Sequence, residues 1–249
     1  MYKAVAGIKS TESNTLNLSL SAINVNTLNI STYKDGPCKT MEKLVAVMNR
    51  GSDVIIMTDC RLGKGIEKIR KIMLLGKNNS YNIYANSTRG ERGVCIAISR
   101  NRNVEIMEEI KDRVYENYLI LRCKVDGKEV LIGGVYGPNI NNRQFYQELI
   151  GIIEGIGIPS IIGGDWNTIL DGNVGEENLD LEDRYNIPQK ENGKMLREWI
   201  ERGGGTVNHL DVNTRWPKLC RTYPSEHVEE SMGNGNIRTM GNLVWTSLS

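Results

Sequence analysis

Short β-branched runs that end in polar residues recur along the chain, and this feature constrains the fold most. "DVIIMT" (53–58), "RGVCIAIS" (92–99) and "PSIIGGDW" (159–166) each predict a strand. The first run is apolar at successive positions, which is typical of a strand buried on both faces. Residues 16–25 and 81–85 also have strand patterns. The chain is therefore predicted to form sheets that other elements cover.

Helical patterns lie between these predicted strands. Residues 38–50, 142–156 and 191–205 have apolar side chains at helical spacing, and glycines follow or end each run. Asp126-Gly127 joins two alternating runs and predicts a hairpin. The acidic, polar stretch 171–190 predicts a long surface loop. Strands interleaved with helices and hairpins indicate a mixed α/β domain.

Composition excludes several classes of protein. Of the 249 residues, 39% are hydrophobic and 24% charged, as in soluble globular proteins. No apolar run approaches the roughly 20 residues of a membrane helix, and the first 15 residues lack a signal-peptide core. The five cysteines fit neither a disulfide framework nor a zinc site, so we expect an intracellular protein, nuclear or cytoplasmic. The net charge of +1 excludes a uniformly basic DNA-coating protein but permits a local basic surface.

Four polar groups stand where predicted strands end. They are Asn24 with Asn26, Asp59, Tyr136, and Asp165 with Asn167. Residues two apart on an extended strand point the same way, which predicts that each Asn or Asp faces its partner. Any one of these groups alone is a common turn residue. As an ordered set at strand ends they predict an active site, because rigid α/β scaffolds display catalytic groups there.

In this order the motifs resemble the endonuclease/exonuclease/phosphatase superfamily over roughly residues 16 to 225. The stretches concerned are "INVNT" (23–27), "TDC" (58–60), "VYGPN" (135–139) and "GDWN" (164–167). The stretches "GERGVCIAIS", "CRTYPS" and "ENGKMLREWI" resemble the endonucleases of non-LTR retrotransposons most. The resemblance implies a pancreatic-DNase-like fold, an α+β four-layered sandwich of two β-sheets flanked by helices.

The resemblance also implies roles in phosphodiester hydrolysis. Asp165 would position and deprotonate the attacking water, and Asn167 would donate its amide to a phosphate oxygen. Tyr136 would donate its hydroxyl to the scissile phosphate. Asp59, in place of the family's longer glutamate, would bind Mg²⁺ or Mn²⁺, with Asn24 on the metal side of the site.

The resemblance implies that the partner is DNA and that the protein binds it as a monomer. It also implies that a reverse transcriptase domain follows this domain in the parent element. Candidate nucleic-acid contacts are Asn26, Lys34, Arg89, Arg92, Asn139 and Arg143. No membrane partner is expected.

The family's two C-terminal pieces, "SRIDY" and "SDH", are missing from this sequence. Neither His209 nor His227 fits the closing motif, and we assign neither a catalytic role. The predicted organisation is an N-terminal extension (1–15), the domain (16–225) and an atypical tail (226–249), with C-terminal strands missing or replaced. Read in a shifted frame, the codons of "NLVWTS" admit "SRMDF", which leads to the hypothesis that the tail is translated out of frame.

Three functions follow from these observations. The first is a metal-dependent, DNA-nicking endonuclease of retrotransposon origin, with activity impaired by loss of the terminal Asp-His. The second is a non-catalytic remnant that binds nucleic acid weakly. The third is a phosphatase acting on a small phosphorylated ligand, because one fold can serve several substrates.

Overall fold

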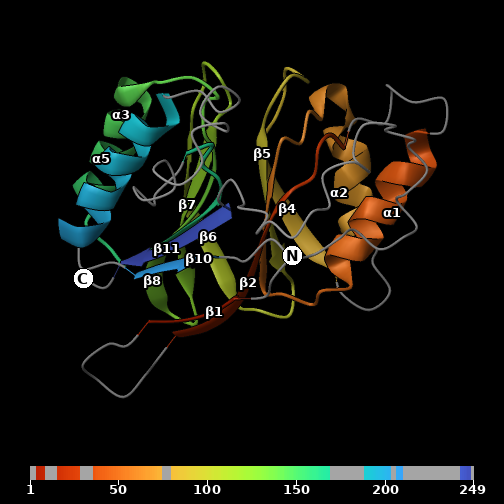
Figure 1. Ribbon diagram of the computed structural model, residues 1–249. Coiled ribbons are helices and arrows are strands. Elements are labelled where there is room, and N and C mark those ends of the chain that lie inside the picture. Colours follow the sequence, from red (N-terminus) through yellow and green to blue (C-terminus); the bar gives the residue numbers. More distant parts are fainter. Residues whose placement is uncertain are drawn as a thin grey trace, which may run out of the picture.

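The computed structural model describes residues 4–8, 16–28, 36–74, 80–168, 188–202, 206–209 and 242–247. Two sheets face each other, and helices cover the outer face of each (Figure 1). The predicted α+β four-layered sandwich is confirmed. Within the described part of the chain, no helix is both long and apolar enough to cross a membrane.

The first sheet has the strand order β1-β2-β3-β5-β4. Its strands are β1 (Ala4–Ile8), β2 (Leu16–Asn24), β3 (Val54–Thr58), β4 (Tyr81–Asn86) and β5 (Val94–Ser99). Strands β2 and β3 are parallel, and the other pairs in this sheet are antiparallel. Helices α1 (Gly36–Met48) and α2 (Ile66–Leu74) cover its outer face, with the short 3-10 turn η1 (Gly63–Gly65) before α2.

The second sheet has the order β10-β11-β9-β8-β7-β6. Its strands are β6 (Val104–Lys111), β7 (Tyr118–Val125), β8 (Lys128–Tyr136), β9 (Ser160–Asp165), β10 (Thr206–His209) and β11 (Asn242–Ser247). Strands β8 and β9 are parallel, and the other adjacent strand pairs in this sheet are antiparallel. Helices α3 (Arg143–Ile156) and α5 (Pro188–Arg202) lie on the outer face of this sheet (Figure 1).

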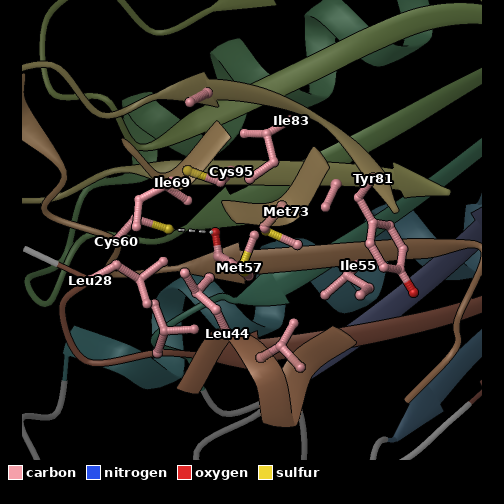
Figure 2. Close-up of a cluster of buried hydrophobic side chains, with 14 of the residues drawn as sticks. Leu28, Leu44, Ile55, Met57, Cys60, Ile69, Met73, Tyr81, Ile83 and Cys95 are labelled. Carbon is pink, nitrogen blue, oxygen red and sulfur yellow. Dashed lines mark hydrogen bonds between the residues drawn. The ribbon is translucent and has the colours of Figure 1, made fainter. Parts of the chain in front are cut away.

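Three apolar clusters fill the three interfaces between the four layers. The central cluster packs strands of one sheet against strands of the other, as Leu20 and Ile56 do with Leu121 and Ile132. The cluster under α1 and α2 includes Leu44, Met57, Ile69, Met73 and the buried thiols of Cys60 and Cys95 (Figure 2). The third cluster lies under α3 and α5. Apolar burial on both faces explains why β3 and β5 lack a polar side.

Local signals in the sequence set the element boundaries. The side chain of Asn142 caps α3 by accepting from the amide of Phe145, and Gly157 ends that helix in the left-handed conformation. The predicted Asp126-Gly127 turn is present, and both residues have positive φ, as a two-residue hairpin turn requires. The surface loop predicted at 171–190 lies outside the described residues, except for 188–190, which begin α5.

Two segments from outside the predicted domain take part in the sheets. Residues 4–8 of the predicted extension form the edge strand β1, which pairs with β2. Residues 242–247 of the predicted tail form β11, which pairs with β9 and lies between it and β10. The tail therefore supplies a strand at the place where strands were expected to be missing or replaced.

Candidate active site

The carboxyl ends of both parallel strand pairs meet at one rim of the sandwich. Asn24 ends β2 in register with Thr58 of β3, and Tyr136 ends β8 in register with Asp165 of β9. The side-chain amide of Asn24 donates to Oδ2 of Asp165 over 2.8 Å. This hydrogen bond joins the two sheets, so the predicted strand-end groups share a single site.

Two glycines let the backbone bring Asp165 to this rim. Gly164 has φ +139°, and a Cβ there would lie 2.1 Å from the carbonyl oxygen of Val135. A Cβ on Gly137 would lie 2.1 Å from the carbonyl oxygen of Trp166. The amide of Gly137 donates to the carbonyl of Asp165 over 2.8 Å. Any larger residue at either position would push the strand ends apart.

The strand ends turn sharply, which corrects the prediction that side chains two apart face each other. Asn26 and Asn167 have φ of 43° and 46°, so the chain is not extended at either residue. The backbone amide of Asn26 donates to Oδ1 of Asn24 (2.9 Å), and the amide of Asn167 donates to Oδ1 of Asp165 (3.1 Å). The Asn167 side chain donates to the carbonyl of Gly137 over 2.7 Å. These turns use backbone donors to orient the two functional side chains.

Asp165 is a partly buried carboxylate, and its hydrogen-bond donors among the described residues are neutral amides. Burial raises its pKa, the hydrogen bonds from Asn24 and the Asn167 amide lower it, and the negative charge of Asp59 raises it again. The net shift is upward, which moves the group toward the pKa range of a general base that works near neutral pH.

Asp59 lies in the same site and has a cation as its partner. Its side chain is 6% exposed, and Oδ1 and Oδ2 accept from Nε and Nη2 of Arg61 over 2.8 and 3.1 Å. This hydrogen bonding to Asp59 raises the pKa of the Arg61 guanidinium. Both residues have positive φ, which folds the short segment back so that the guanidinium covers the carboxylate.

Tyr136 lies between the two carboxylates and two guanidinium groups. The Arg92 guanidinium lies 5.0 Å from the centre of the tyrosine ring. Burial raises the pKa of Tyr136, as do the charges of Asp59 and Asp165, while Arg92 and Arg61 lower it. The net shift is upward, so the hydroxyl stays protonated and can donate a hydrogen bond at neutral pH.

The predicted nucleic-acid contacts separate into three groups. Arg92 belongs to the site, and Asn26 and Asn139 are exposed beside it. Arg89 donates its guanidinium to the carbonyl oxygens of Arg113 and Val114 and so holds a neighbouring loop. Arg143 lines a groove between α3 and α5, among a different set of residues. Lys34 lies outside the described residues.

Comparisons with known proteins give the fold a name. No family model and no curated protein matches the chain. TDP2 from C. elegans is 14% identical with a TM-score of 0.51, and the match covers 93% of this chain but only 65% of that one. A protein of the endonuclease/exonuclease/phosphatase family from Bacteroides thetaiotaomicron is 11% identical with a TM-score of 0.51, over 92% of this chain and 79% of that one. The chain has the endonuclease/exonuclease/phosphatase fold.

A divalent metal ion, which the resemblance to this fold family implies, fits the oxygen donors at the rim. Asp59 and Asn24 offer carboxylate and amide oxygens, and each of these oxygens accepts one hydrogen bond from the described residues and keeps a further lone pair. Within the described ranges, no group of three or more His, Cys, Asp or Glu side chains could hold a metal. Oxygen donors of this kind are the ligands that a hard divalent cation prefers.

Sequence reasoning missed two residues that this fold brings to the rim. Arg61 reaches Asp59 because of the left-handed backbone at both positions, and no local pattern signals that geometry. Asn117 precedes β7, where its side chain accepts from Arg92 and its carbonyl accepts from the amide of Tyr136. Only the pairing of β7 with β8 places Asn117 at the site. An arginine two residues after a strand-end aspartate is the only signal that could have suggested Arg61.

Proposed function

We propose that this protein is a metal-dependent phosphodiester hydrolase that nicks DNA and derives from a retrotransposon. The observation that supports this most directly is the hydrogen bond from Asn24 to Asp165. It joins the carboxyl ends of both sheets at a rim that also holds Asp59 and Tyr136. A buried base, a phenolic donor and two arginines at one edge are the groups that phosphodiester hydrolysis needs.

In the proposed reaction a water molecule attacks the phosphorus atom and gives its proton to the Asp165 carboxylate. The bond from phosphorus to the leaving sugar oxygen breaks, and that oxygen takes a proton from solvent. Asn24 and the Asn167 amide fix the orientation of the Asp165 carboxylate through their hydrogen bonds. These bonds fix the position of the base before the substrate binds.

Negative charge builds on the phosphate oxygens as the water attacks. Tyr136 would donate its hydroxyl to one of these oxygens, and Arg92 contributes positive charge beside the tyrosine ring. Mg²⁺ held by Asp59 and Asn24 would neutralise further charge on the phosphate. Arg61 keeps the Asp59 carboxylate oriented toward the rim through both of its oxygens.

The substrate class rests on the motif resemblance together with the charges of the site. The resemblance of "VYGPN" and "CRTYPS" to retrotransposon endonucleases favours DNA, and the exposed arginines Arg89 and Arg113 flank the rim on the side of Arg92. A DNA strand carries a phosphate at each nucleotide, so several cations along its path can contribute to affinity.

A plasmid-nicking assay tests this proposal. Supercoiled plasmid should be converted to the open circle in Mg²⁺ but not in EDTA, and Asp165→Ala should abolish the conversion. Asp126→Asn is the matched control, because Asp126 lies in the exposed β7–β8 turn, where Asn-Gly serves equally well. Equal nicking by the wild type and Asp165→Ala would reject the assignment of the base.

Two further assays separate the alternatives. DNA binding without nicking under all metal conditions would identify a non-catalytic remnant, which the pairing of both Asp59 oxygens with Arg61 also favours. Phosphate release from inositol phosphates, in the absence of plasmid nicking, would instead identify a small-molecule phosphatase.

A further inference from the structure

The loop between β6 and β7 presents two large apolar side chains to solvent. Val114 is 56% exposed and Tyr115 is 62% exposed. Ile140, which follows β8, is 64% exposed. These three belong to the seven exposed large apolar residues of the described part of the chain. They lie on the two loops that adjoin the site, and they are the most exposed of the seven.

Hydrogen bonds hold the Tyr115 loop in one conformation. Oδ1 of Asp112 accepts from the amides of Val114 (2.9 Å) and Tyr115 (3.0 Å), and Oδ2 accepts from the amide of Asn117 (3.0 Å). The Arg89 guanidinium donates to the carbonyl of Val114 over 2.5 Å. With its backbone fixed in this way, the tyrosine ring loses little further freedom when a ligand covers it.

Glu116 anchors this loop to the loop that follows β4. It is 3% exposed and has φ 58°, an unfavourable conformation for a residue with a side chain. Its carboxylate accepts from the amide of Thr88 (2.8 Å), from the Thr88 hydroxyl and from the amide of Arg89. Such a conformation persists only where the surroundings fix it. These bonds therefore indicate that the fold holds Tyr115 in an exposed position.

The loop leads directly into the candidate active site. The carbonyl of Asn117 accepts from the amide of Tyr136 over 2.6 Å, and its side chain accepts from Arg92 over 3.1 Å. Tyr115 is therefore two residues before Asn117, which contacts both Arg92 and Tyr136. A strand whose phosphate lies at Tyr136 would bring an adjacent base to the loop.

We propose that Tyr115 stacks on a nucleobase next to the phosphate bound at Tyr136, with Val114 packing beside it. This inference rests on the proposed function, because it needs a nucleic-acid strand across the rim. A nucleic acid fits better than a protein surface because three arginines belong to or contact this loop: Arg113 lies in it, Arg89 donates to the Val114 carbonyl, and Arg92 donates to Asn117. Interleaved aromatic rings and cations are typical of single-strand binding surfaces, where stacking tolerates any base. The expected ligand is an unpaired or displaced base.

Fluorescence of a single-stranded oligonucleotide that carries 2-aminopurine tests the stacking directly. Titration in EDTA keeps the strand intact. Wild-type protein should quench the probe, Tyr115→Phe should quench it equally, and Tyr115→Ala should lose both the quenching and about tenfold in affinity. Leu74→Ala is the control, because Leu74 is an exposed apolar residue at the end of α2. Unchanged melting temperatures would show that the exposed Tyr115 can be replaced without unfolding.

The outcomes separate this inference from the proposed function. Quenching that depends on Tyr115, together with an absence of plasmid nicking, would support the stacking and reject the hydrolase. Normal nicking with equal binding by wild type and Tyr115→Ala would reject the stacking and leave the hydrolase in place. An equal loss of affinity in Tyr115→Phe and Tyr115→Ala would also overturn it, because the hydroxyl and not the ring would then make the contact.

Discussion

Two carboxylates at the same rim, one from each sheet, differ in the partners that surround them. Asp59 of the first sheet forms an ion pair with Arg61 through both oxygens. Within the described part of the chain, Asp165 of the second sheet accepts from the neutral amides of Asn24 and Asn167, and its pKa is raised. A cation thus balances the charge of one acid, while neutral dipoles hold the other.

Under the proposed function, this difference would divide the chemistry between the two sheets. A carboxylate whose pKa is raised by burial accepts a proton more readily, which suits the base that activates water. A carboxylate whose two oxygens both accept from a guanidinium has a fixed orientation, which suits cation binding or phosphate positioning. Where the surroundings of paired acids differ in this way, their roles differ too.

Asp165→Asn should have the largest effect. The substitution keeps the size of the side chain but removes the group that takes the proton, so kcat should fall by about 10² to 10⁴. Affinity for DNA should change little, because the proposed base acts after binding. Steady-state nicking rates and binding anisotropy, measured beside Asp126→Asn, would check this. A fall in affinity with kcat unchanged would instead make Asp165 a binding group.

Arg61→Ala should have the next largest effect, on stability. The change leaves the buried Asp59 carboxylate without its partner, which should cost roughly 1–3 kcal/mol in metal-free buffer. Mg²⁺ should then take over the role of the guanidinium, so it should raise the melting temperature of Arg61→Ala more than that of the wild type.

Thermal melting with and without Mg²⁺ measures this difference. Arg70→Ala is the matched control, because Arg70 pairs with the exposed Glu67 on the surface of α2. If Mg²⁺ raises the melting temperatures of Arg61→Ala and the wild type equally, then Mg²⁺ and the Arg61 guanidinium do not compete for Asp59.

Much of the fold could be predicted because the local signals are strong. Apolar β-branched runs gave β3, β5 and β9, and the Asp-Gly turn gave the β7–β8 hairpin. Strand β6 was missed because it is an edge strand rich in exposed glutamates, which hides its alternation. Strand β11 was missed because its sequence is short and aperiodic. Its place beside β9 depends on pairing over a long separation in the chain.

The grouping of the strand-end residues at one rim could be predicted, but the contacts between them could not. Strand-end positions gave Asn24, Asp59, Tyr136 and Asp165, because parallel strands bring their carboxyl ends to one edge. The bond from Asn24 to Asp165 depends on how the two sheets face each other, and periodicity carries no information about that. Arg61 depends on positive φ at two non-glycine residues, which no propensity rule favours.

Tyr136→Phe tests the proposed hydrogen bond from the Tyr136 hydroxyl to a phosphate oxygen. Loss of one hydrogen bond to the transition state should lower kcat by roughly tenfold, with substrate affinity retained. Tyr84→Phe, on strand β4, is the control for a lost phenol elsewhere. Unchanged kcat in Tyr136→Phe would show that the hydroxyl has no catalytic role and that the tyrosine only packs against Arg92.

The smallest expected effect is a shift in the titration of Asp165 in metal-free Asp59→Asn. The charge of Asp59 raises the pKa of Asp165, so removing it stabilises the ionised form and moves the midpoint to lower pH. Arg61, released from its ion pair, would act in the same direction. A raised folded-state pKa contributes stability below the unfolded pKa and loses it as the pH rises through the folded value. In Asp59→Asn that loss should end at lower pH and be smaller. Carboxyl carbon NMR across the acid range would follow the midpoint, and an upward or absent shift would show that the two carboxylates do not interact.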